Sequence, residues 1–493
     1  MRQTILMVNP VSTSPNKQRL PMSLLSVAAM LHDDYDFEII DGNLIADPAS
    51  HIIERAHATN CQLIAMTVMP GPQLQQAVPL VKTLKAVLPD VTIIWGGYFA
   101  SHHYELCLNS GYVDYAVVGQ GEIAFRKFVD TFFAGGSMRD VPSLAYCEDG
   151  ELVLTPKAPI APLNNLPQYP YHKIDVESYV GTSYLGQRVL SHHSSWGCPF
   201  ACNFCAIVPL ANRRWSAESA ERVGETMRYL KEHHNIDGME FHDMDFFVKE
   251  DRAVKIAEQM IGLDINWWAL GRVDTMMSYS DESYQILADS GLKMVFMGAE
   301  AGDDETLKLM NKGGRSGINQ TLAIVERMAK FGIVPELSFV LGTPPDPIAS
   351  IESTIQFIRQ VKDLNPATEI ILYMYTPVAE FESPMMQEAI AQGFNFPRTL
   401  EEWASEEWAE KSMRRSPGTP WSVDPIRRKI RNFETVINAF YPTVTDMRLQ
   451  GAMRTLLKTV SGWRYRLEFY SAPYELKILQ KMIQYRRPET TGF

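Results

Sequence analysis

The chain has 493 residues, 46% of them hydrophobic and 21% charged, so it is long enough for about three globular domains and is neither disordered nor coiled-coil over most of its length. Its 46 lysines and arginines against 58 aspartates and glutamates give a net charge of −12, which argues against nucleic acid as the main partner. No stretch has the length of a membrane span or the pattern of a secretory signal, and six cysteines are too few for a disulfide framework, so a cytoplasmic location is expected.

Residues 1–135 alternate short apolar runs with helical patterns. The expected strands are 5–8, 37–40, 63–68, 91–95 and 115–118, with helices near 22–31, 48–58, 72–88 and 121–134. This alternation predicts a doubly wound parallel sheet of Rossmann-like type, with a ligand at the C-terminal ends of the strands. No Gly-x-Gly-x-x-Gly follows the first strand, so a dinucleotide is not the expected ligand. Instead Thr67 closes the third strand, and Gly96 and Gly97 close the fourth.

The middle of the chain is predicted to hold a linker and then a barrel. Residues 136–185 are rich in proline, glycine and asparagine and read as a linker over the surface. Over 186–395 the alternation resumes, with expected strands at 188–192, 238–242, 266–270, 294–298, 335–341 and 369–375. Six strand–helix units are too many for another small sheet and predict a partial (β/α)6 barrel of TIM type.

Residues 396–493 are predicted to form a mostly helical C-terminal domain. Residues 411–493 carry 16 basic against 6 acidic side chains, a net +10, so the rest of the chain carries −22. The stretch from Trp463 to Arg487 mixes aromatic and basic residues. Such a face is either simply solvated or binds peripherally to an anionic membrane surface. Trp403, Trp408 and Trp421 belong either to a helical cap packed on the barrel or to the barrel mouth.

The most specific motif is a group of three cysteines. Cys198, Cys202 and Cys205 have the spacing C-x3-C-x2-C. Three thiolates on one short loop can bind three irons of a 4Fe–4S cluster and leave the fourth iron open. A zinc site needs four ligands, and the nearest imidazoles, His192 and His193, lie upstream at an unusual spacing. An iron–sulfur cluster is therefore the favoured interpretation.

The cysteine motif, with Phe204 before its last cysteine, resembles the radical S-adenosylmethionine (SAM) superfamily. The downstream segments that share this resemblance are Glu240–Phe246, Arg272–Asp274, Gly298–Glu300 and Phe339–Pro344. The N-terminal sheet, with Leu20-Pro21, Gly96-Gly97 and Gly119–Glu122, resembles the cobalamin-binding domain of the subclass that uses both cofactors. The resemblance covers roughly residues 4–380.

The resemblance implies a role for each matching residue of the SAM site. Cys198, Cys202 and Cys205 would hold the cluster, whose open iron takes the amino and carboxylate groups of SAM. Asp243 and Asp245 fall where the family contacts the methionine amino group; the alternative is a pair of loop-capping acids.

Two further positions carry family roles of their own. Arg272 would pair with the methionine carboxylate or merely bridge Asp274. Glu300 would accept both ribose hydroxyls or be a surface acid that begins a helix.

For cobalamin, the resemblance implies a close backbone approach at Gly96 and Gly97 and a contact between the Thr67 hydroxyl and the buried nucleotide base. A tight strand-end turn and a plain strand-end threonine are the alternatives. The loop from Pro10 to Pro21 has no histidine, so cobalamin is expected without a histidine under the cobalt, unless the sheet has kept its fold and lost its ligand.

Two further departures fall near the substrate space. Trp196 replaces the usual arginine before Gly-Cys, and Thr376–Phe381 replaces a Pro-Gly-Thr after the sixth strand. Both departures weaken any transfer of substrate identity from the family.

The function that the resemblance implies is C-methylation of an unactivated carbon in a small-molecule substrate. One SAM would methylate cobalamin to methylcobalamin, and a second would be cleaved to a 5′-deoxyadenosyl radical after reduction by an external flavodoxin or ferredoxin. A ring-forming or oxidative cyclase that uses both cofactors is the first alternative. A non-catalytic cobalamin or iron–sulfur binding protein is the second.

Overall fold

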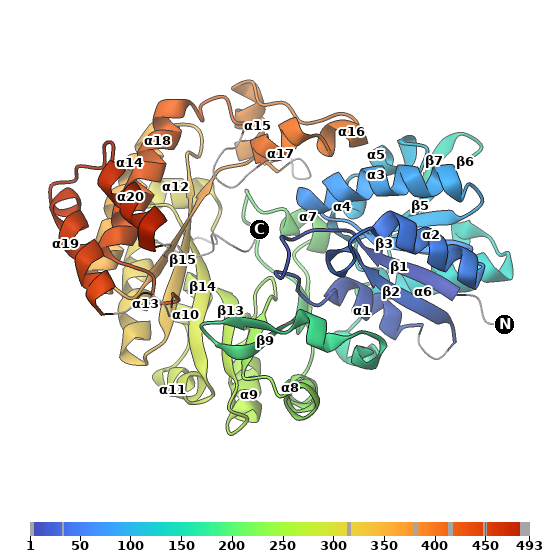
Figure 1. Ribbon diagram of the computed structural model, residues 1–493, viewed down its shortest axis with the longest axis horizontal. Coiled ribbons are helices and arrows are strands. Elements are labelled where there is room, and N and C mark those ends of the chain that lie inside the picture. The colour runs from blue at the N-terminus through green and yellow to red at the C-terminus, as the bar shows by residue number, and fades with distance from the viewer. Residues whose placement is uncertain are drawn as a thin grey trace.

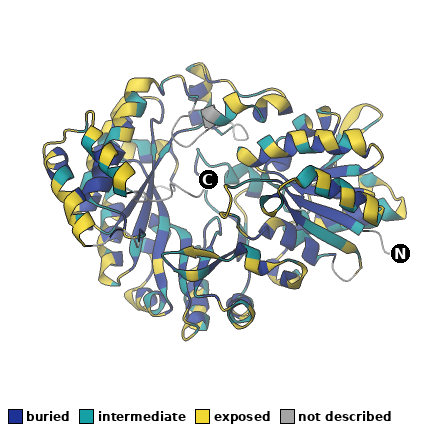
Figure 2. Ribbon diagram, in the orientation of Figure 1, coloured by how far each residue is buried: buried dark blue, intermediate teal, exposed yellow. Residues whose placement is uncertain are grey.

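The computed structural model describes residues 4–31, 34–312, 317–378, 383–412, 418–446, 449 and 451–483. Two sheets form two halves of the molecule, and helices from the last hundred residues run along the top and the outer side (Figure 1). The strands of both sheets are mostly buried, as Figure 2 shows, and the exposed residues lie on the outer faces of the helices. The expected fold class is confirmed.

The N-terminal sheet has the order β2-β1-β3-β4-β5-β6-β7. Its strands are β1 (Thr4–Asn9), β2 (Asp36–Asp41), β3 (Leu63–Thr67), β4 (Thr92–Gly96), β5 (Tyr115–Val117), β6 (Leu144–Glu148) and β7 (Glu151–Leu154). β1 to β5 are parallel, whereas β6 and β7 run antiparallel at the edge. The stretch 136–185, expected to be a linker, therefore adds two strands to this sheet. Its proline-rich composition applies to the part that follows β7.

Helices cover both faces of this sheet because each parallel crossover must return over one face. They are α1 (Met22–Ala29), α2 (Pro48–Thr59), α3 (Pro72–Val87), α4 (Gly97–His102), α5 (Tyr104–Asn109) and α6 (Gly121–Ala134). The apolar sides of α1 and α6 share one core with the sheet, and those of α2, α3 and α5 share the other. The sheet is thus buried on both faces, as its nearly continuous apolar strands require.

The second sheet has the order β16-β15-β14-β13-β12-β9-β8. Its strands are β8 (Gly181–Ser183), β9 (Gly186–His192), β12 (Gly238–Phe241), β13 (Asn266–Arg272), β14 (Leu292–Glu300), β15 (Val334–Leu341) and β16 (Glu369–Met374). All neighbours are parallel except the β8–β9 hairpin. The six parallel strands are the six predicted for the partial barrel.

The helices of the barrel half lie between its strands in the sequence. They are α8 (Ala220–His234), α9 (Glu250–Met260), α10 (Val273–Met277), α11 (Asp281–Asp289), α12 (Asp304–Leu309), α13 (Ile318–Lys330) and α14 (Pro347–Leu364). A separate hairpin of β10 (Ser195–Gly197) and β11 (Trp215–Ala217), with α7 (Ile207–Ala211) between its strands, follows β9. This hairpin carries the cysteine loop.

The C-terminal helices fall into two groups (Figure 1). They are α15 (Pro384–Ala391), α16 (Leu400–Trp403), α17 (Glu406–Ser412), α18 (Asp424–Phe440), α19 (Ala452–Arg466) and α20 (Tyr474–Ile483). Trp403 of α16 packs on Phe99 and His103 of the N-terminal half. The α18–α20 group packs on the barrel half, where the ring of Tyr465 contacts the guanidinium of Arg359 in α14. The indole of Trp421 donates to the carbonyl of Gly342 at the end of β15. The helical cap was expected to pack on the barrel alone, but it bridges both halves, because Trp403 packs on the N-terminal half. Across the described ranges, no helix combines the length and apolar character needed to cross a bilayer.

Candidate active site

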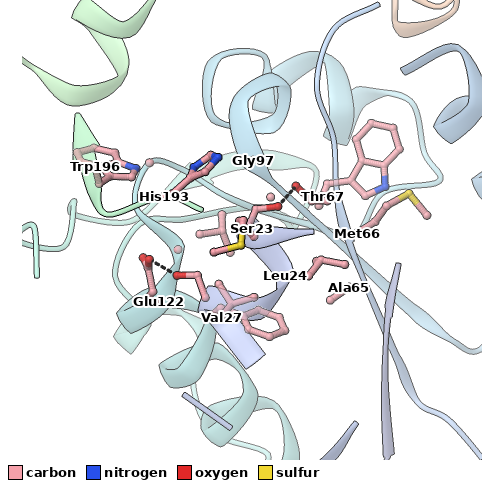
Figure 3. Close-up of a pocket in the computed structure, with 18 of the residues that line it drawn as sticks. Ser23, Leu24, Val27, Ala65, Met66, Thr67, Gly97, Glu122, His193 and Trp196 are labelled. Atoms are coloured by element: carbon pink, nitrogen blue, oxygen red, sulfur yellow. Dashed lines mark hydrogen bonds between the residues drawn. The ribbon is translucent and has the colours of Figure 1, made fainter. Parts of the chain in front are cut away.

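A cavity opens in the N-terminal half between the sheet and the helices α1 and α6 (Figure 3). It measures about 1030 Å³, its open mouth included. Ala65, Ile94 and Val117 line it from the sheet, and Val27 and Phe125 line it from the two helices. The cavity begins at the C-terminal ends of β3 and β4, which is where a doubly wound sheet binds its ligand.

The rim of this cavity holds the three residues that the sequence placed at a ligand. Thr67, Gly96 and Gly97 all line it, and the Ser23 hydroxyl lies 3.1 Å from the Thr67 hydroxyl. Gly97 has φ +86°, and a Cβ there would lie 2.9 Å from Thr67 Oγ1 and 3.2 Å from the Val68 backbone. Any larger residue would be strained and would crowd the strand ends. The rim therefore consists of glycine backbone without side chains and of the two hydroxyl groups of Ser23 and Thr67.

The opposite side of the cavity is closed by the segment that joins the barrel to the cysteine loop. His193, Ser195 and Trp196 line the cavity, and Trp196 is two residues before Cys198. His193 keeps accessible surface because it faces the cavity, yet the surrounding protein desolvates it, and burial lowers the pKa of His193 to about 3. Its imidazole is thus neutral. The cavity and the cysteines share one short piece of chain.

The three cysteines lie on the loop between β10 and β11. Cys202 is buried, whereas Cys198 and Cys205 are partly buried, and burial raises the pKa of Cys198 to about 12. Arg272 Nη1 donates to Cys202 Sγ at 3.2 Å, so a guanidinium lies beside the thiols. Within the described part of the chain, no three His, Cys, Asp or Glu side chains converge to hold one metal ion. In a cubane cluster, each thiolate binds a separate iron.

The two aspartates after β12 differ in their surroundings. Asp243 accepts hydrogen bonds from the backbone N–H and the hydroxyl of Ser194, at 3.1 and 2.9 Å. Asp245 is 1% exposed, and its Oδ2 has no hydrogen-bond partner among the described residues. Burial raises the pKa of Asp245 to about 7, although the nearby Arg272 lowers it in part. A buried carboxylate oxygen without a partner suits a cationic ligand group.

The expected Arg272 and Glu300 lie at the adjacent strand ends. Arg272 holds Asp274 through Nε and Nη2, both at 2.9 Å, and also donates to the carbonyl of Lys312 at 2.7 Å. Its bridging role is thus present in the structure. Glu300 Oε1 lies 2.6 Å from Lys312 Nζ, and both residues are buried. Glu300 is therefore not a surface acid.

Lys312 is a site residue that sequence reasoning missed. It follows the short helix α12 and matches none of the motif segments, so only the ion pair with Glu300 reveals its position. Its ammonium lies 5.8 Å from the centre of the Phe204 ring, inside the cysteine motif. Together with Arg272, it places two cations beside the cysteine loop, and their partners Glu300 and Asp274 balance the charge of each.

Comparison with known protein families accounts for both halves. The B12 binding domain model matches residues 12–129, and the radical SAM superfamily model matches residues 194–358. The chain thus combines a B12 binding domain with a radical SAM domain. The cofactors expected from the sequence are those of the two matched domains: cobalamin for the first, and a 4Fe–4S cluster with SAM for the second.

Curated relatives with different names are similar to this chain in sequence. An uncharacterized methyltransferase of Pyrococcus horikoshii is 27% identical over 366 residues, which is 72% of this chain and 78% of the relative. The anaerobic magnesium-protoporphyrin IX monomethyl ester cyclase of Synechocystis is 23% identical over 312 residues, which is 61% of this chain and 62% of the cyclase. The hopanoid C-3 methylase of Methylococcus capsulatus is 27% identical over 237 residues, which is 47% of this chain and 44% of the methylase.

Two solved structures share the whole fold. The radical SAM methyltransferase TsrM of Kitasatospora setae, with cobalamin and a 4Fe–4S cluster bound, has a TM-score of 0.67 at 16% identity, covering 98% of this chain and 99% of TsrM. The cobalamin-dependent radical SAM enzyme OxsB has a TM-score of 0.64 at 15% identity, covering 98% of this chain and 71% of OxsB. At such low identity, these likenesses concern the fold.

The residues of this chain fit the three cofactors on structural grounds. The rim at Gly97 would be filled by a Cβ, which is the condition for a close approach of a large ligand. Asp245 has a buried oxygen with no partner in the described part of the chain, which suits the SAM ammonium. The three cysteines supply the thiols for a cluster beside Arg272 and the Lys312 ion pair.

Proposed function

We propose that this protein is a C-methyltransferase that acts on an unactivated carbon of a small molecule. The carrying observation is the shared segment from His193 to Cys198, which closes the cobalamin cavity on one side and enters the cysteine loop on the other. A methyl donor and a hydrogen-abstracting radical must act on the same carbon, so the two cofactor sites have to be neighbours. The methyltransferases among the relatives support the proposal.

The chain's residues bind and orient the reactants. Asp245 would take the ammonium of SAM, Glu300 its ribose hydroxyls, and Cys198, Cys202 and Cys205 the cluster, with Asp243 holding Ser194 in place. When bound, the reduced cluster supplies the electron that cleaves SAM to a 5′-deoxyadenosyl radical, and cobalamin supplies a methyl group derived from a second SAM. Trp196 and the bridging C-terminal helices would help to exclude water.

The ratio of the two SAM products tests methyl transfer. With substrate, reductant and both cofactors, turnover is expected to yield 5′-deoxyadenosine and S-adenosylhomocysteine in a 1:1 ratio. Each methylation consumes two SAM molecules, one cleaved to the radical and one that donates its methyl group. Liquid chromatography of the quenched reaction measures both products. If the substrate is converted and 5′-deoxyadenosine forms without S-adenosylhomocysteine, methyl transfer is rejected.

That contrary outcome would favour the second candidate, a cyclase or oxidative ring-forming enzyme that uses the same cofactors. The cyclase of Synechocystis among the relatives is the observation that supports it. Both candidates require an external one-electron donor, and we propose a flavodoxin or ferredoxin as this partner. We also propose that the protein acts in the cytoplasm.

We also propose a peripheral contact with an anionic membrane through α19 and α20. Exposed large apolar residues concentrate there; the most exposed are Leu467, Tyr474 and Met482, at 73%, 68% and 74%. The stretch from Trp463 is divided between α19 and α20, and buried Arg464 joins the two helices through its ion pair with Glu475. Tyr485, Arg486 and Arg487 lie outside the described residues. Exposed Lys458, Lys477 and Lys481 accompany the apolar side chains, as at a membrane surface.

Co-sedimentation with vesicles tests this contact. Binding to phosphatidylglycerol-containing vesicles is expected at low salt and should weaken at high salt, because salt screens the attraction between the lysines and the anionic lipid. Little binding to pure phosphatidylcholine is expected, because its surface carries no net charge. The double variant Leu467→Ser/Met482→Ser should bind about tenfold more weakly. Ile348→Ser, an exposed residue of α14, is the matched control and should bind like the wild type. No sedimentation of the wild type at low salt would end the proposal.

A further inference from the structure

A carboxyl group lies inside the cobalamin cavity. Glu122, in the first turn of α6, lines the cavity, is 7% exposed and accepts a hydrogen bond from the hydroxyl of Ser26 in α1. Figure 3 shows Glu122 near Val27 on the helical wall, away from the Ser23–Thr67 pair. None of the site roles assigned above uses it.

The depth of this pair follows from helix geometry. Ser23 bonds Thr67, the last residue of β3, and so marks the rim. Ser26 is three residues further along α1, about 4.5 Å down the helix axis. Because Glu122 bonds Ser26, its carboxyl group lies below the rim, between the two helices and the sheet.

The walls around this pair indicate what enters. Ala65, Ile94, Val117 and Phe125 present apolar surface, so the Ser26–Glu122 pair is a polar group in an otherwise apolar slot. A slot of this kind suits a flat aromatic base joined to a polar sugar phosphate, whereas a broad macrocycle matches the smooth glycine rim. In cobalamin these two parts are the nucleotide tail and the corrin ring.

We propose that Glu122, oriented by Ser26, hydrogen-bonds the nucleotide tail of cobalamin and thereby selects the complete cofactor over corrinoids that lack the tail. The inference rests on the cobalamin site of the proposed function and adds a selectivity residue to it. Burial raises the pKa of Glu122, although the Ser26 hydrogen bond lowers it in part. A protonated carboxyl can donate to a phosphate or a ring nitrogen without charge repulsion.

Binding of two corrinoids to the full-length chain tests the proposal without any turnover. Aquocobalamin carries the tail and aquocobinamide lacks it, and quenching of tryptophan fluorescence reports binding of each. We expect Glu122→Ala to weaken cobalamin binding about tenfold and cobinamide binding less than twofold, because only the tail loses its partner. Glu122→Gln should recover most of the affinity, since its amide can also donate.

Cobinamide binding doubles as a folding control for each variant. Glu105→Ala, at an exposed acid in the first turn of α5 in the same half, should leave both affinities unchanged. Equal losses for the two corrinoids, or no loss for cobalamin, would overturn the role of Glu122. If the wild type bound neither corrinoid, the cobalamin site itself would be rejected along with it.

Discussion

Replacement of Cys202 by alanine is expected to remove the iron–sulfur cluster and to reduce SAM cleavage by at least about 10³-fold. In the proposed site each of the three thiolates would hold one iron, so the loss of the buried Cys202 would leave a corner of the cluster without a protein ligand. Iron and sulfide analysis of anaerobically reconstituted protein measures the loss directly. Reductive SAM cleavage, followed as 5′-deoxyadenosine, measures its consequence.

The matched control is Cys147→Ala. Cys147 is an exposed cysteine of β6, in the other half of the molecule, and its replacement should leave iron, sulfide and SAM cleavage at wild-type levels. If Cys202→Ala retained the full iron and sulfide content, the cluster assignment would be wrong. A Cys202→Ala variant with full biological activity would favour a non-catalytic binding protein.

The second large effect is expected at Asp245. Its buried Oδ2 lacks a partner among the described residues, so the SAM ammonium would complete a charge-assisted hydrogen bond there. Such bonds contribute about 1.5–3 kcal/mol, so Asp245→Asn should raise the SAM dissociation constant by roughly ten- to a hundredfold. Equilibrium dialysis with labelled SAM on cluster-loaded protein gives this constant.

Asp243→Asn is the informative comparison, because the two aspartates are two residues apart and equally buried. Both carboxylate oxygens of Asp243 accept hydrogen bonds from Ser194, so its replacement should lower the melting temperature by a few degrees. Its effect on SAM affinity should be smaller than that of Asp245→Asn. The reverse pattern, with SAM affinity lost in Asp243→Asn and kept in Asp245→Asn, would exchange the two roles.

The elements of both sheets followed from the sequence because each parallel strand is a short apolar run with its own boundaries. All six barrel strands begin and end within two residues of their expected positions. The edge hairpin of β6 and β7 was missed. Its strands are short and outside the alternating pattern, and β7 is mostly exposed, so they pair only because the edge of β5 is available.

The site was predictable where its residues share a local motif. Cys198, Cys202 and Cys205 are fixed by their spacing, and the positions of Thr67, Gly96 and Gly97 at one rim follow from the rule that ligands gather at strand ends. The difference between Asp243 and Asp245 was not predictable, since it depends on which of them Ser194 contacts. Lys312 and Glu122 were also missed as partners, because each is recognised only through a residue on another element.

The sequence by itself therefore determined the fold class through periodicity and the three cysteines through their spacing, and the resemblance of its motifs to a known family supplied the expected cofactors. Only the tertiary structure decided which carboxylate keeps a free oxygen, which lysine pairs with Glu300, and that one segment joins the cavity to the cysteine loop. These features depend on contacts between segments far apart in the chain, and neither periodicity nor motif spacing reports such contacts.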